Sequence, residues 1–433
     1  MRLALAHPGV GQFVQQTARA LLEADMLSAY WTTFADQPNA LWRDLLIKLA
    51  RVGGLNLDEE LRRRAITQIP RGLVNVDPAW EIGRSILTKL KIDPRLLDAV
   101  WQHEILRFDA GVARKALTNA EGVYSYNGCA LASFSEAAKR QMPRVYEVSV
   151  PEEGFAQRIF QSEMEKFPEL DDGKAPFFWF LEPRVEWTER ACSEWSLADV
   201  IIVNSTFTRD SYAAAGFNVQ KVRIVPLGAP EVGDCAIESD RSRHDPLRVM
   251  YAGNFSILKG AHYILSAWRS LFLKRSAILE IYGVNTLPKS VMTDLPDSIR
   301  ISPTIPQERL FEKYRAADVL VFPTLCDGFG LVVTEALANG LPVITTACAG
   351  SSDLIQDGEN GFIIPAGDAT ALANALEWCL GHRAELQAMR QSARQSARRW
   401  QWSDFRQVLT SNVIAGLQQA GYGRRGNYLS GLA

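Results

Sequence analysis

The sequence predicts an α/β protein built from two doubly wound domains, each with a sheet of parallel strands. Residues 317–346 follow the order apolar strand, glycine turn, helix and strand, which is typical of a βαβ unit. The chain opens with the same strand, turn and helix order over residues 3–24. A chain of 433 residues is too long for one hydrophobic core, so an α/β unit near each end favours two domains.

The composition is that of an ordinary globular protein, with 47% hydrophobic and 22% charged residues. The net charge of −2 provides no field that would draw the protein onto nucleic acid, so we expect no nucleic acid partner. The six cysteines show no C-x-x-C spacing, which argues against a zinc or disulfide framework and favours a reducing compartment. No apolar run approaches the roughly 18–20 residues of a membrane span, and the expected location is the cytoplasm.

The first domain is expected to begin with a strand at Leu3–Ala6, a glycine turn at His7–Gly11 and a helix at Gln12–Ala24. A single G-x-G is a weak indication of a dinucleotide site, and the acid expected about 20 residues later is not convincingly placed. A dehydrogenase is therefore a minor alternative. Further strands are expected at 27–34, 122–126 and 144–150, and 222–228 is expected to be the last strand with its exit turn. Residues 195–203 are expected to pass from helix to strand, and helices are expected at 130–141 and 206–215.

One helix of this domain raises the question of a membrane surface. Leu41–Ala50 is apolar-rich and carries Arg43 and Lys48, and three arginines follow at 62–64. A basic amphipathic helix can lie on an anionic membrane, on the inner face in a cytoplasmic protein. The alternative is a helix packed on its own domain, and the sequence leaves both open.

Residues 229–246 are polar and acidic and are expected to link a first domain of residues 1–228 to a second of residues 229–404. A strand at Leu247–Ala252 opens the second sheet, and a glycine turn at Gly253–Gly260 follows it. Lys259, just before the helix at 261–271, can pair with a diphosphate as a point charge. The alternative is a lysine in a solvated loop.

The turn Asp327–Gly330 separates the strand at 317–322 from a helix at Leu331–Asn339. Backbone N–H groups at a glycine turn and helix start can hold phosphate oxygens. Glu335 can accept hydrogen bonds from two ribose hydroxyls, and Asp327 can reach hydroxyls of a group attached to the phosphate. Two acids at this spacing suit a nucleotide-sugar, although a solvated turn acid and a glutamate that favours the helix dipole remain the alternative.

The segment from Pro323 to Asp357 resembles the E-x7-E motif of retaining GT-B-fold glycosyltransferases of family 4, also called group 1. Their usual form is E-G-F-G-L-x-x-x-E-A-x-A-x-G-x-P-V-I, and here Asp327 takes the first acid position. The run A-L-A-S-F-S-E-A-A-K-R at 130–140 resembles a bacterial polysaccharide branch of the family. The resemblance implies a GT-B architecture of two Rossmann-like domains that face an interdomain cleft. It also implies a C-terminal helix, at about 405–433, that packs back on the first domain.

The resemblance also implies roles for individual residues. In the family the first acid contacts the donor sugar and the second holds the ribose. The family pattern G-R-L-x-x-x-K-G contributes an arginine and a lysine to the donor phosphates; Lys259 matches the lysine, and Asn254 stands where arginine is usual. The first turn faces the cleft, and His7 beside it is either a site residue or a packed histidine. The expected catalytic residues are Asp327, Lys259 and His7. The expected donor-binding residues are Glu335, Gly328, Phe329, Gly330, Leu331, Asn254, Gly253, Gly9 and Gly11.

The implied reaction moves a sugar from a UDP-, GDP- or ADP-linked donor to a glycan or lipid-linked acceptor, with retention of the anomeric configuration. No metal or other cofactor is expected, because no D-x-D lies near the donor motif and Asp171-Asp172 is far from it. Two alternatives remain. The substitutions at 254 and 327 suit a catalytically weak member that acts as a binding protein, and the fold also serves epimerases and phosphorylases. The base, the sugar and the acceptor stay open.

Overall fold

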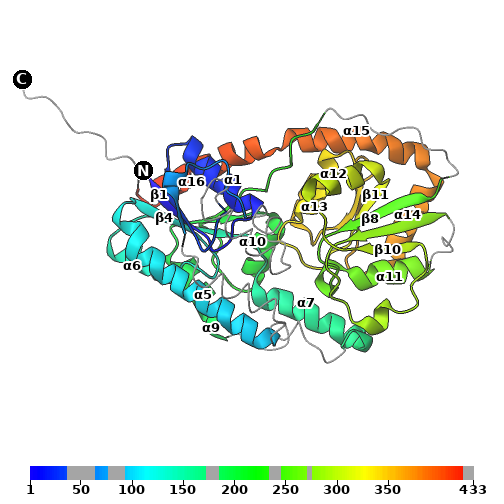
Figure 1. Cartoon of the computed structure of the whole chain (residues 1–433), viewed down its shortest axis with the longest axis horizontal. Coiled ribbons are helices and arrows are strands. Elements are labelled where there is room, and N and C mark those ends of the chain that lie inside the picture. Colours follow the sequence, from blue (N-terminus) through cyan, green and yellow to red (C-terminus); the bar gives the residue numbers. More distant parts are fainter. Residues whose placement is uncertain (37–63, 77–92, 172–184, 234–244, 271–275, 423–433) are drawn as a thin grey trace, which may run out of the picture.

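The computed structural model describes residues 1–36, 64–76, 93–171, 185–233, 245–270 and 276–422. The chain forms two sheets side by side, one of seven strands and one of six, and every strand pairing within them is parallel (Figure 1). The predicted α/β class with two doubly wound sheets is therefore confirmed. The predicted basic helix at 41–50 lies outside the described residues.

The first sheet has the strand order β3-β2-β1-β4-β5-β6-β7. Strands β1 and β6 are buried along their whole length, because helices cover both faces of the sheet. The strand order reverses between β1 and β4, and in open α/β sheets ligands bind beyond the carboxyl ends of the strands at such a reversal. The strands are β1 Leu3–Ala6, β2 Leu27–Thr32, β3 Val74–Val76, β4 Gly122–Tyr126, β5 Arg144–Val148, β6 Val200–Val203 and β7 Val222–Ile224.

Some helices and strands of the first domain end at residues other than those that the sequence predicts. The helix expected at 130–141 is shorter, because Gln141 has a φ of 53°, which a right-handed helix cannot include. The strand expected at 27–34 ends at Thr32, because the Thr33 N–H donates to the carbonyl of Pro8 instead of to a neighbouring strand. The helices are α1 Gln12–Glu23, α5 Pro94–Lys115, α6 Leu131–Lys139, α7 Glu153–Lys166, α9 Val185–Leu197 and α10 Thr206–Ala214, with the short helices η1 Arg71–Leu73, η2 Ala116–Thr118 and η3 Pro168–Leu170.

The second sheet has the order β10-β9-β8-β11-β12-β13 and reverses between β8 and β11. The Lys259 turn follows β8 and the Asp327 turn follows β11, so the two turns leave the sheet side by side. The strands are β8 Leu247–Ala252, β9 Ala277–Tyr282, β10 Ile299–Ser302, β11 Val319–Phe322, β12 Val343–Thr346 and β13 Gly361–Ile364. The helices are α11 Ala261–Ser270, α12 Gln307–Ala316, α13 Leu331–Ala338, α14 Ala369–Gly381 and α15 Arg383–Arg399, with η4 Ile257–Lys259, η5 Lys289–Met292 and η6 Gly350–Leu354.

After α15 the chain returns to the first domain as α16, Trp402–Gln419, and Figure 1 shows both helices along one edge of the molecule. Phe405 and Leu409 of α16 are buried in the first domain's core. The chain crosses between the domains twice, after β7 and before α16. The two crossing segments pair through a parallel bridge between Ala229 and Gln401. A Cβ on Gly228 would lie 2.5 Å from the backbone nitrogen of Trp402, so only glycine allows the two crossings to approach this closely.

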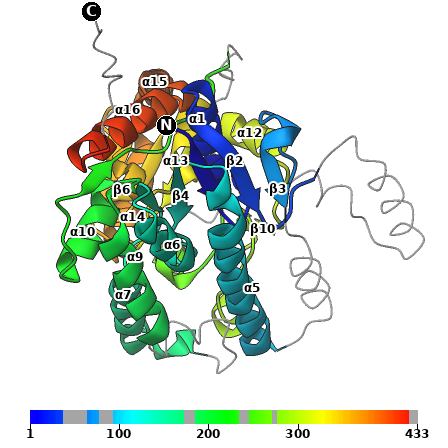
Figure 2. The same cartoon turned by 90° about the vertical axis from the view of Figure 1, so that its left-hand side faces the viewer.

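Helix α7 joins the domains on the opposite edge, where Figures 1 and 2 show it with α5 and α9. Its side chain Phe160 and Leu170 of the following η3 are buried in the second domain's core. At its start, the backbone N–H of Glu152 donates to Ser211 of the first domain. Thus α7 spans both domains. Within the described ranges, no helix combines the length and the apolar character that crossing a membrane would need.

Candidate active site

The turns after β8 and β11 bring Lys259 and Asp327 into an ion pair. Gly260 has a φ of +71°, and a side chain there would collide with the carbonyl of Pro323. Glycine therefore lets η4 lie directly against the exit of β11. In this arrangement Lys259 Nζ lies 2.6 Å from Asp327 Oδ2 and donates to the carbonyl of Cys326 at 3.3 Å. Both charged side chains are partly exposed, at 26% and 18%.

The glycine turn itself is pressed against the first domain. Asp327 Oδ1 accepts the Phe329 N–H at 3.1 Å, and Ser205 Oγ donates to the carbonyl of Gly328 at 2.6 Å. The Phe329 ring is buried in the first domain's core, and Leu331 packs against the same core. These two side chains join the domains, so any contact that these residues make with a donor would come from their backbone.

Helix α13 starts at Gly330, which has a φ of +83° and offers no side-chain cap to the first N–H groups of the helix. One turn later lies Glu335, which is 9% exposed. Its Oε1 accepts Gln307 Nε2 at 2.9 Å and its Oε2 accepts the Tyr314 hydroxyl at 3.2 Å. Burial raises the pKa of Glu335, and these two hydrogen bonds oppose the effect only in part. Helix α12 thus fixes this carboxyl group.

The remaining predicted residues of the second domain lie at the start of the first turn. Gly253 has a φ of +113°, and a Cβ there would meet open space. Asn254 is exposed, and its carbonyl accepts the Tyr251 hydroxyl at 2.7 Å. The turn is therefore held by its backbone, and position 254 supplies no positive charge.

The turn after β1 holds His7 in one orientation. Its Nδ1 lies 2.8 Å from the Gly9 nitrogen and 2.7 Å from the Gly9 oxygen, so the tautomer decides which group it bonds. Burial lowers the pKa of His7 to about 4, against a smaller opposing effect of the Gly9 backbone, so the ring is neutral at pH 7. The ring also meets Tyr126 edge to face, with centroids 4.6 Å apart. The sequence offered no orienting partner for His7, because the partner is a backbone atom. Gly11 is exposed at the start of α1.

A cavity of about 750 Å³ connects these turns. Its wall includes His7 and Gly9 from the first domain, and Leu258 and Cys326, the direct neighbours of Lys259 and Asp327. Of the twelve predicted site residues, only His7 and Gly9 are among the described lining residues. The other ten are not: Gly11, Gly253, Asn254, Lys259, Asp327, Gly328, Phe329, Gly330, Leu331 and Glu335.

Most of the cavity wall was not expected from the sequence. Helices α5 and α9 supply Trp101, Glu104, Ile105, Trp187, Thr188 and Ala191. The one local signal for α5 was Asp93-Pro94, a helix start in which Asp93 accepts the Arg95 N–H at 2.8 Å. Within the part of the chain that the structure describes, no group of three or more His, Cys, Asp and Glu residues is placed to hold a metal ion. Lys259 and the uncapped start of α13 together can bind an anion.

Solved structures share this architecture over nearly the whole chain. HepE of Anabaena, solved with UDP, matches with a TM-score of 0.63 and 14% identity, over 96% of this chain and 100% of that one. Sucrose-phosphate synthase of Thermosynechococcus elongatus matches with a TM-score of 0.61 and 19% identity, over 97% of this chain and 100% of that one. The fold is GT-B, as the resemblance implied.

Residues 236–397, which include the whole second sheet, match the family described as Glycosyl transferases group 1. The D-inositol 3-phosphate glycosyltransferase of Xylanimonas cellulosilytica is 28% identical over 212 residues, 44% of this chain and 50% of that protein. The protein of the same name from Streptomyces griseus is 30% identical over 184 residues, 37% of this chain and 39% of that protein. The chain thus spans about half or less of these relatives. The group 1 resemblance predicted from the E-x7-E motif is confirmed.

Proposed function

We propose that this protein is a glycosyltransferase that moves a sugar from a nucleotide-sugar to a glycan or lipid-linked acceptor, with retention of the anomeric configuration. The observation that carries the proposal is the Lys259–Asp327 pair, held 2.6 Å apart beside the uncapped start of α13. The direct neighbours of this pair, Leu258 and Cys326, line a cavity that residues of the turn after β1 also line, and both turns follow strands at which the strand order reverses. A cation, an anion-binding helix start and an adjacent acid suit a diphosphate that carries a sugar.

Each residue has a role in the proposed reaction. Lys259 and the first N–H groups of α13 stabilise the negative charge that develops on the departing diphosphate. Glu335 accepts the ribose hydroxyls through lone pairs that Gln307 and Tyr314 leave available. Asp327 contacts hydroxyls of the donor sugar. Gly253 and Gly9 let the backbone approach the donor closely.

Retention is the outcome that the resemblance to the family implies, and His7 does not argue against it. An inverting transfer needs a base on the acceptor side of the sugar, and the pKa of His7 near 4 makes it a poor one. The acceptor oxygen instead attacks the face from which the diphosphate leaves. The bond from the anomeric carbon to the phosphate oxygen breaks as the new glycosidic bond forms. The released diphosphate oxygen takes the acceptor proton.

UDP-sugars are the first donors to test, because HepE was solved with UDP and with UDP-glucose. We propose that Lys259 and backbone N–H groups neutralise the diphosphate, so turnover should survive EDTA. Proton NMR of the first product formed from an α-linked donor should show an α linkage. A β-linked product would mean that a base acts on the acceptor, with His7 the first residue to replace.

The Lys259–Asp327 pair also favours a second candidate, a catalytically weak protein that binds the donor without efficient transfer. Asp327 is one methylene shorter than the usual glutamate and is engaged by Lys259, while Asn254 adds no cation. Release of UDP from UDP-glucose without acceptor separates the two candidates: measurable hydrolysis indicates an enzyme, and binding with no turnover on any acceptor indicates the weak member.

A further inference from the structure

The glycine turn that is proposed to hold the donor is fastened to the first domain by a serine hydroxyl. Ser205 is the N-cap of α10, and its Oγ accepts the Thr208 N–H at 3.0 Å. The same Oγ donates to the carbonyl of Gly328, 123 residues later, at 2.6 Å. Ser205 is fully buried. A Cβ on Gly328 would lie 2.3 Å from the Ser149 carbonyl, so glycine lets the turn lie directly against the first domain.

Two hydroxyls reach the Gly328 carbonyl, and their protons decide which of them bonds it. A hydroxyl has one proton to donate. Thr208 Oγ1 lies 3.2 Å from the Gly328 oxygen but only 2.8 Å from Asn204 Oδ1. Ser205 Oγ lies 2.6 Å from the Gly328 oxygen and 3.1 Å from Thr208 Oγ1. When each hydroxyl makes its shorter contact, Ser205 is the donor to the turn and Thr208 donates to Asn204.

This hydrogen bond orients the carboxylate of Asp327 through one planar peptide unit. The Gly328 carbonyl and the Phe329 N–H belong to the same peptide bond, which is rigid. Ser205 holds the carbonyl end, and Asp327 Oδ1 accepts the N–H end at 3.1 Å. Asp327 Oδ2 lies 2.6 Å from Lys259 Nζ. A chain of hydrogen bonds therefore runs from the first domain to the lysine of the second, and each bond polarises the next.

The backbone of Asp327 is held without Ser205. The Asp327 N–H donates to the Cys348 carbonyl at 3.0 Å, and the Asp327 carbonyl accepts the Gly350 N–H at 3.1 Å. Both partners belong to the second domain. Removal of the Ser205 hydroxyl therefore leaves the course of the chain at Asp327 in place and frees the peptide to which its carboxylate bonds.

We propose that Ser205 is a positioning residue, which holds the Asp327 carboxylate in the orientation that contacts the donor sugar. The inference rests on the proposed function, in which Asp327 binds that sugar, and it names the residue that controls this contact. Because Ser205 and Asp327 belong to different domains, the sugar contact is complete only while α10 touches the glycine turn. The ribose contact proposed for Glu335 lies within the second domain and does not need Ser205.

The first test compares a nucleotide-sugar with its nucleotide by calorimetry. The ligands are UDP-, GDP- and ADP-glucose with UDP, GDP and ADP, and the pair that the unmodified protein binds best is used for the variants. Ser205→Gly removes the hydroxyl and keeps a residue that N-cap positions accept better than alanine. It should weaken binding of the nucleotide-sugar about fivefold, the scale of one hydrogen bond, and change binding of the nucleotide less than about twofold. An equal loss for both ligands, or no loss for either, would overturn the proposal.

The second test asks whether Ser205 acts through Asp327. Ser205→Gly is combined with Asp327→Ala, and the affinity for the nucleotide-sugar is measured in the parent, the two single variants and the double variant. Once the carboxylate is absent, Ser205→Gly should change this affinity less than about twofold. The same loss in both backgrounds would show that the serine only supports the fold, and would contradict the positioning role.

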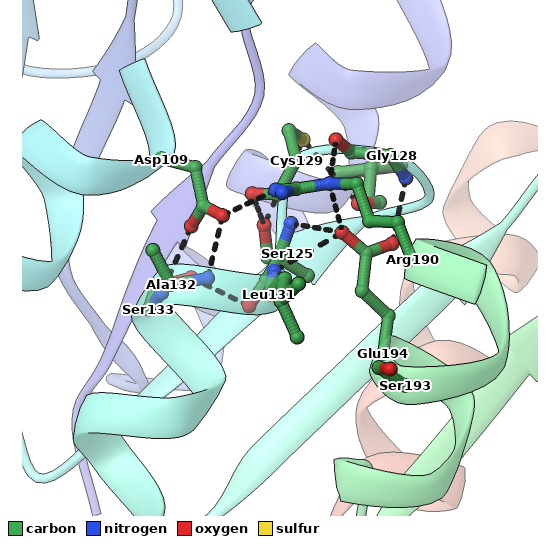
Figure 3. A network of polar contacts seen from close by, with 12 residues as sticks. Asp109, Ser125, Gly128, Cys129, Leu131, Ala132, Ser133, Arg190, Ser193 and Glu194 are labelled. Carbon is green, nitrogen blue, oxygen red and sulfur yellow. Dashed lines mark hydrogen bonds and ion pairs between the residues drawn. The ribbon is translucent and has the colours of Figure 1, made fainter. Parts of the chain in front are cut away.

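Two variants are matched controls. Thr208→Val removes the other hydroxyl near the Gly328 carbonyl. Ser133→Ala removes an equally buried serine on α6 (Figure 3), whose Oγ donates to the Ala130 carbonyl at 3.1 Å. Both variants should keep the parental ratio of nucleotide-sugar to nucleotide affinity. A larger change of this ratio in Thr208→Val than in Ser205→Gly would assign the donated proton to the threonine and overturn the proposal.

Failure of the proposed function gives a different result. Calorimetry needs no turnover, so it decides the role of Ser205 even in a protein that binds the donor without transferring its sugar. If the unmodified protein neither transfers nor hydrolyses any of the three nucleotide-sugars, the transferase function fails and the binding comparison still stands. If none of the three binds, the function and the positioning role are both wrong.

Discussion

At the scale of single residues, Lys259 carries the largest expected effect on catalysis. Removal of one preorganised charge-stabilising donor typically lowers kcat by about 10²–10³-fold. We therefore expect Lys259→Ala to lower kcat/KM for sugar transfer by about two to three orders of magnitude. Lys259→Arg should restore only part of this rate, because the guanidinium is a wider donor.

The control for Lys259 is Lys139→Ala on α6, which removes a lysine that is 74% exposed and paired only loosely with Glu136 at 3.5 Å. It should leave turnover unchanged. Initial rates of UDP release with acceptor present measure both variants. A Lys259→Ala protein that keeps the parental rate would remove this residue from the site.

Glu335 is expected to act on binding. If it holds the ribose, Glu335→Ala should weaken UDP binding by roughly 1.5–3 kcal/mol, the scale of a hydrogen bond to a charged group. Glu308→Ala, on the exposed first turn of α12, is the control. Calorimetry with UDP measures both, and equal affinities in folded proteins would count against the ribose role.

Glu147 predicts a pH dependence of stability. Burial raises its pKa to about 7 from an ordinary 4.5, although the Tyr124 and Thr17 hydroxyls donate to it. A raised folded-state pKa gives stability that is fully present below pH 4.5 and is lost as the pH rises through about 7. The free energy of unfolding should therefore fall between pH 5 and pH 8. Glu147→Gln should flatten this fall in urea titrations, and an identical fall in the variant would assign the effect to another group.

The sequence predicted the residues of the two turns that are proposed to hold the donor, but few of the other residues around the cavity. Each of the two motifs lies within one short stretch of chain, so its spacing is visible in the sequence. One motif contains Asp327 and Glu335, and the other contains Lys259. Trp101 and Trp187 are 86 residues apart in sequence and meet only because α5 and α9 pack together. The sequence also could not predict that Phe329 is buried in the core of the first domain, because the motif gives the position of this residue in the chain and not its neighbours in space.

At the scale of elements, the start of α6 depends on two carboxylates from other helices. Glu194 of α9 accepts the N–H groups of Ala130 and Leu131, and Asp109 of α5 accepts those of Ala132 and Ser133. These hydrogen bonds (Figure 3) satisfy the first backbone N–H donors of α6, and the negative carboxylates interact favourably with the positive end of the helix dipole. Arg190 lies between the two acids, 3.0 Å from Glu194. The three helices are thus joined by one buried network.

Arg190→Met should therefore destabilise the protein by about 3–5 kcal/mol, because it leaves two buried carboxylates without their cation. Arg209→Met on α10 is the control: its pair with Asp210 is exposed and should contribute less than about 1 kcal/mol. Urea unfolding of the purified proteins measures both. A loss for Arg190→Met no larger than the control would show that the acids are solvated.

Strands were more predictable than helices. Buried parallel strands such as β6 are short uninterrupted apolar runs, which the sequence shows directly. Helix α5 was missed because the family resemblance is weak over its residues, and α15 because its residues are mostly polar. Helix ends depend on single backbone angles, such as the positive φ of Gln141, which residue type does not fix.

At the scale of the whole molecule, α7 should limit how far the domains separate. Glu163 on α7 accepts His262 Nε2 at 2.9 Å and the Tyr263 hydroxyl at 2.7 Å, both from α11 of the second domain. Phe160→Ala should cost about 3–5 kcal/mol of stability and loosen this contact. In small-angle X-ray scattering, UDP should leave the radius of gyration of the parent protein unchanged and should reduce that of Phe160→Ala. A large ligand-dependent change in the parent would contradict this.

The two-domain architecture followed from length and two strand–turn–helix units, but the contacts between the domains did not. The family resemblance implied a cleft, and the glycine turn that was expected to face a ligand is packed in part against Ser205. Such contacts join residues more than 100 positions apart, and nothing in local periodicity records them.

The paired crossings at Ala229 and Gln401 define an axis about which the domains can turn most easily, because only two adjacent strands need to twist there. Helix α7 lies on the opposite edge, far from this axis (Figure 1). A rotation displaces each atom in proportion to its distance from the axis. A movement too small to disturb the bridge at Ala229 therefore separates Glu163 from His262. Because Glu152 and Glu153 at the start of α7 belong to the cavity wall, the same movement changes the shape of the cavity.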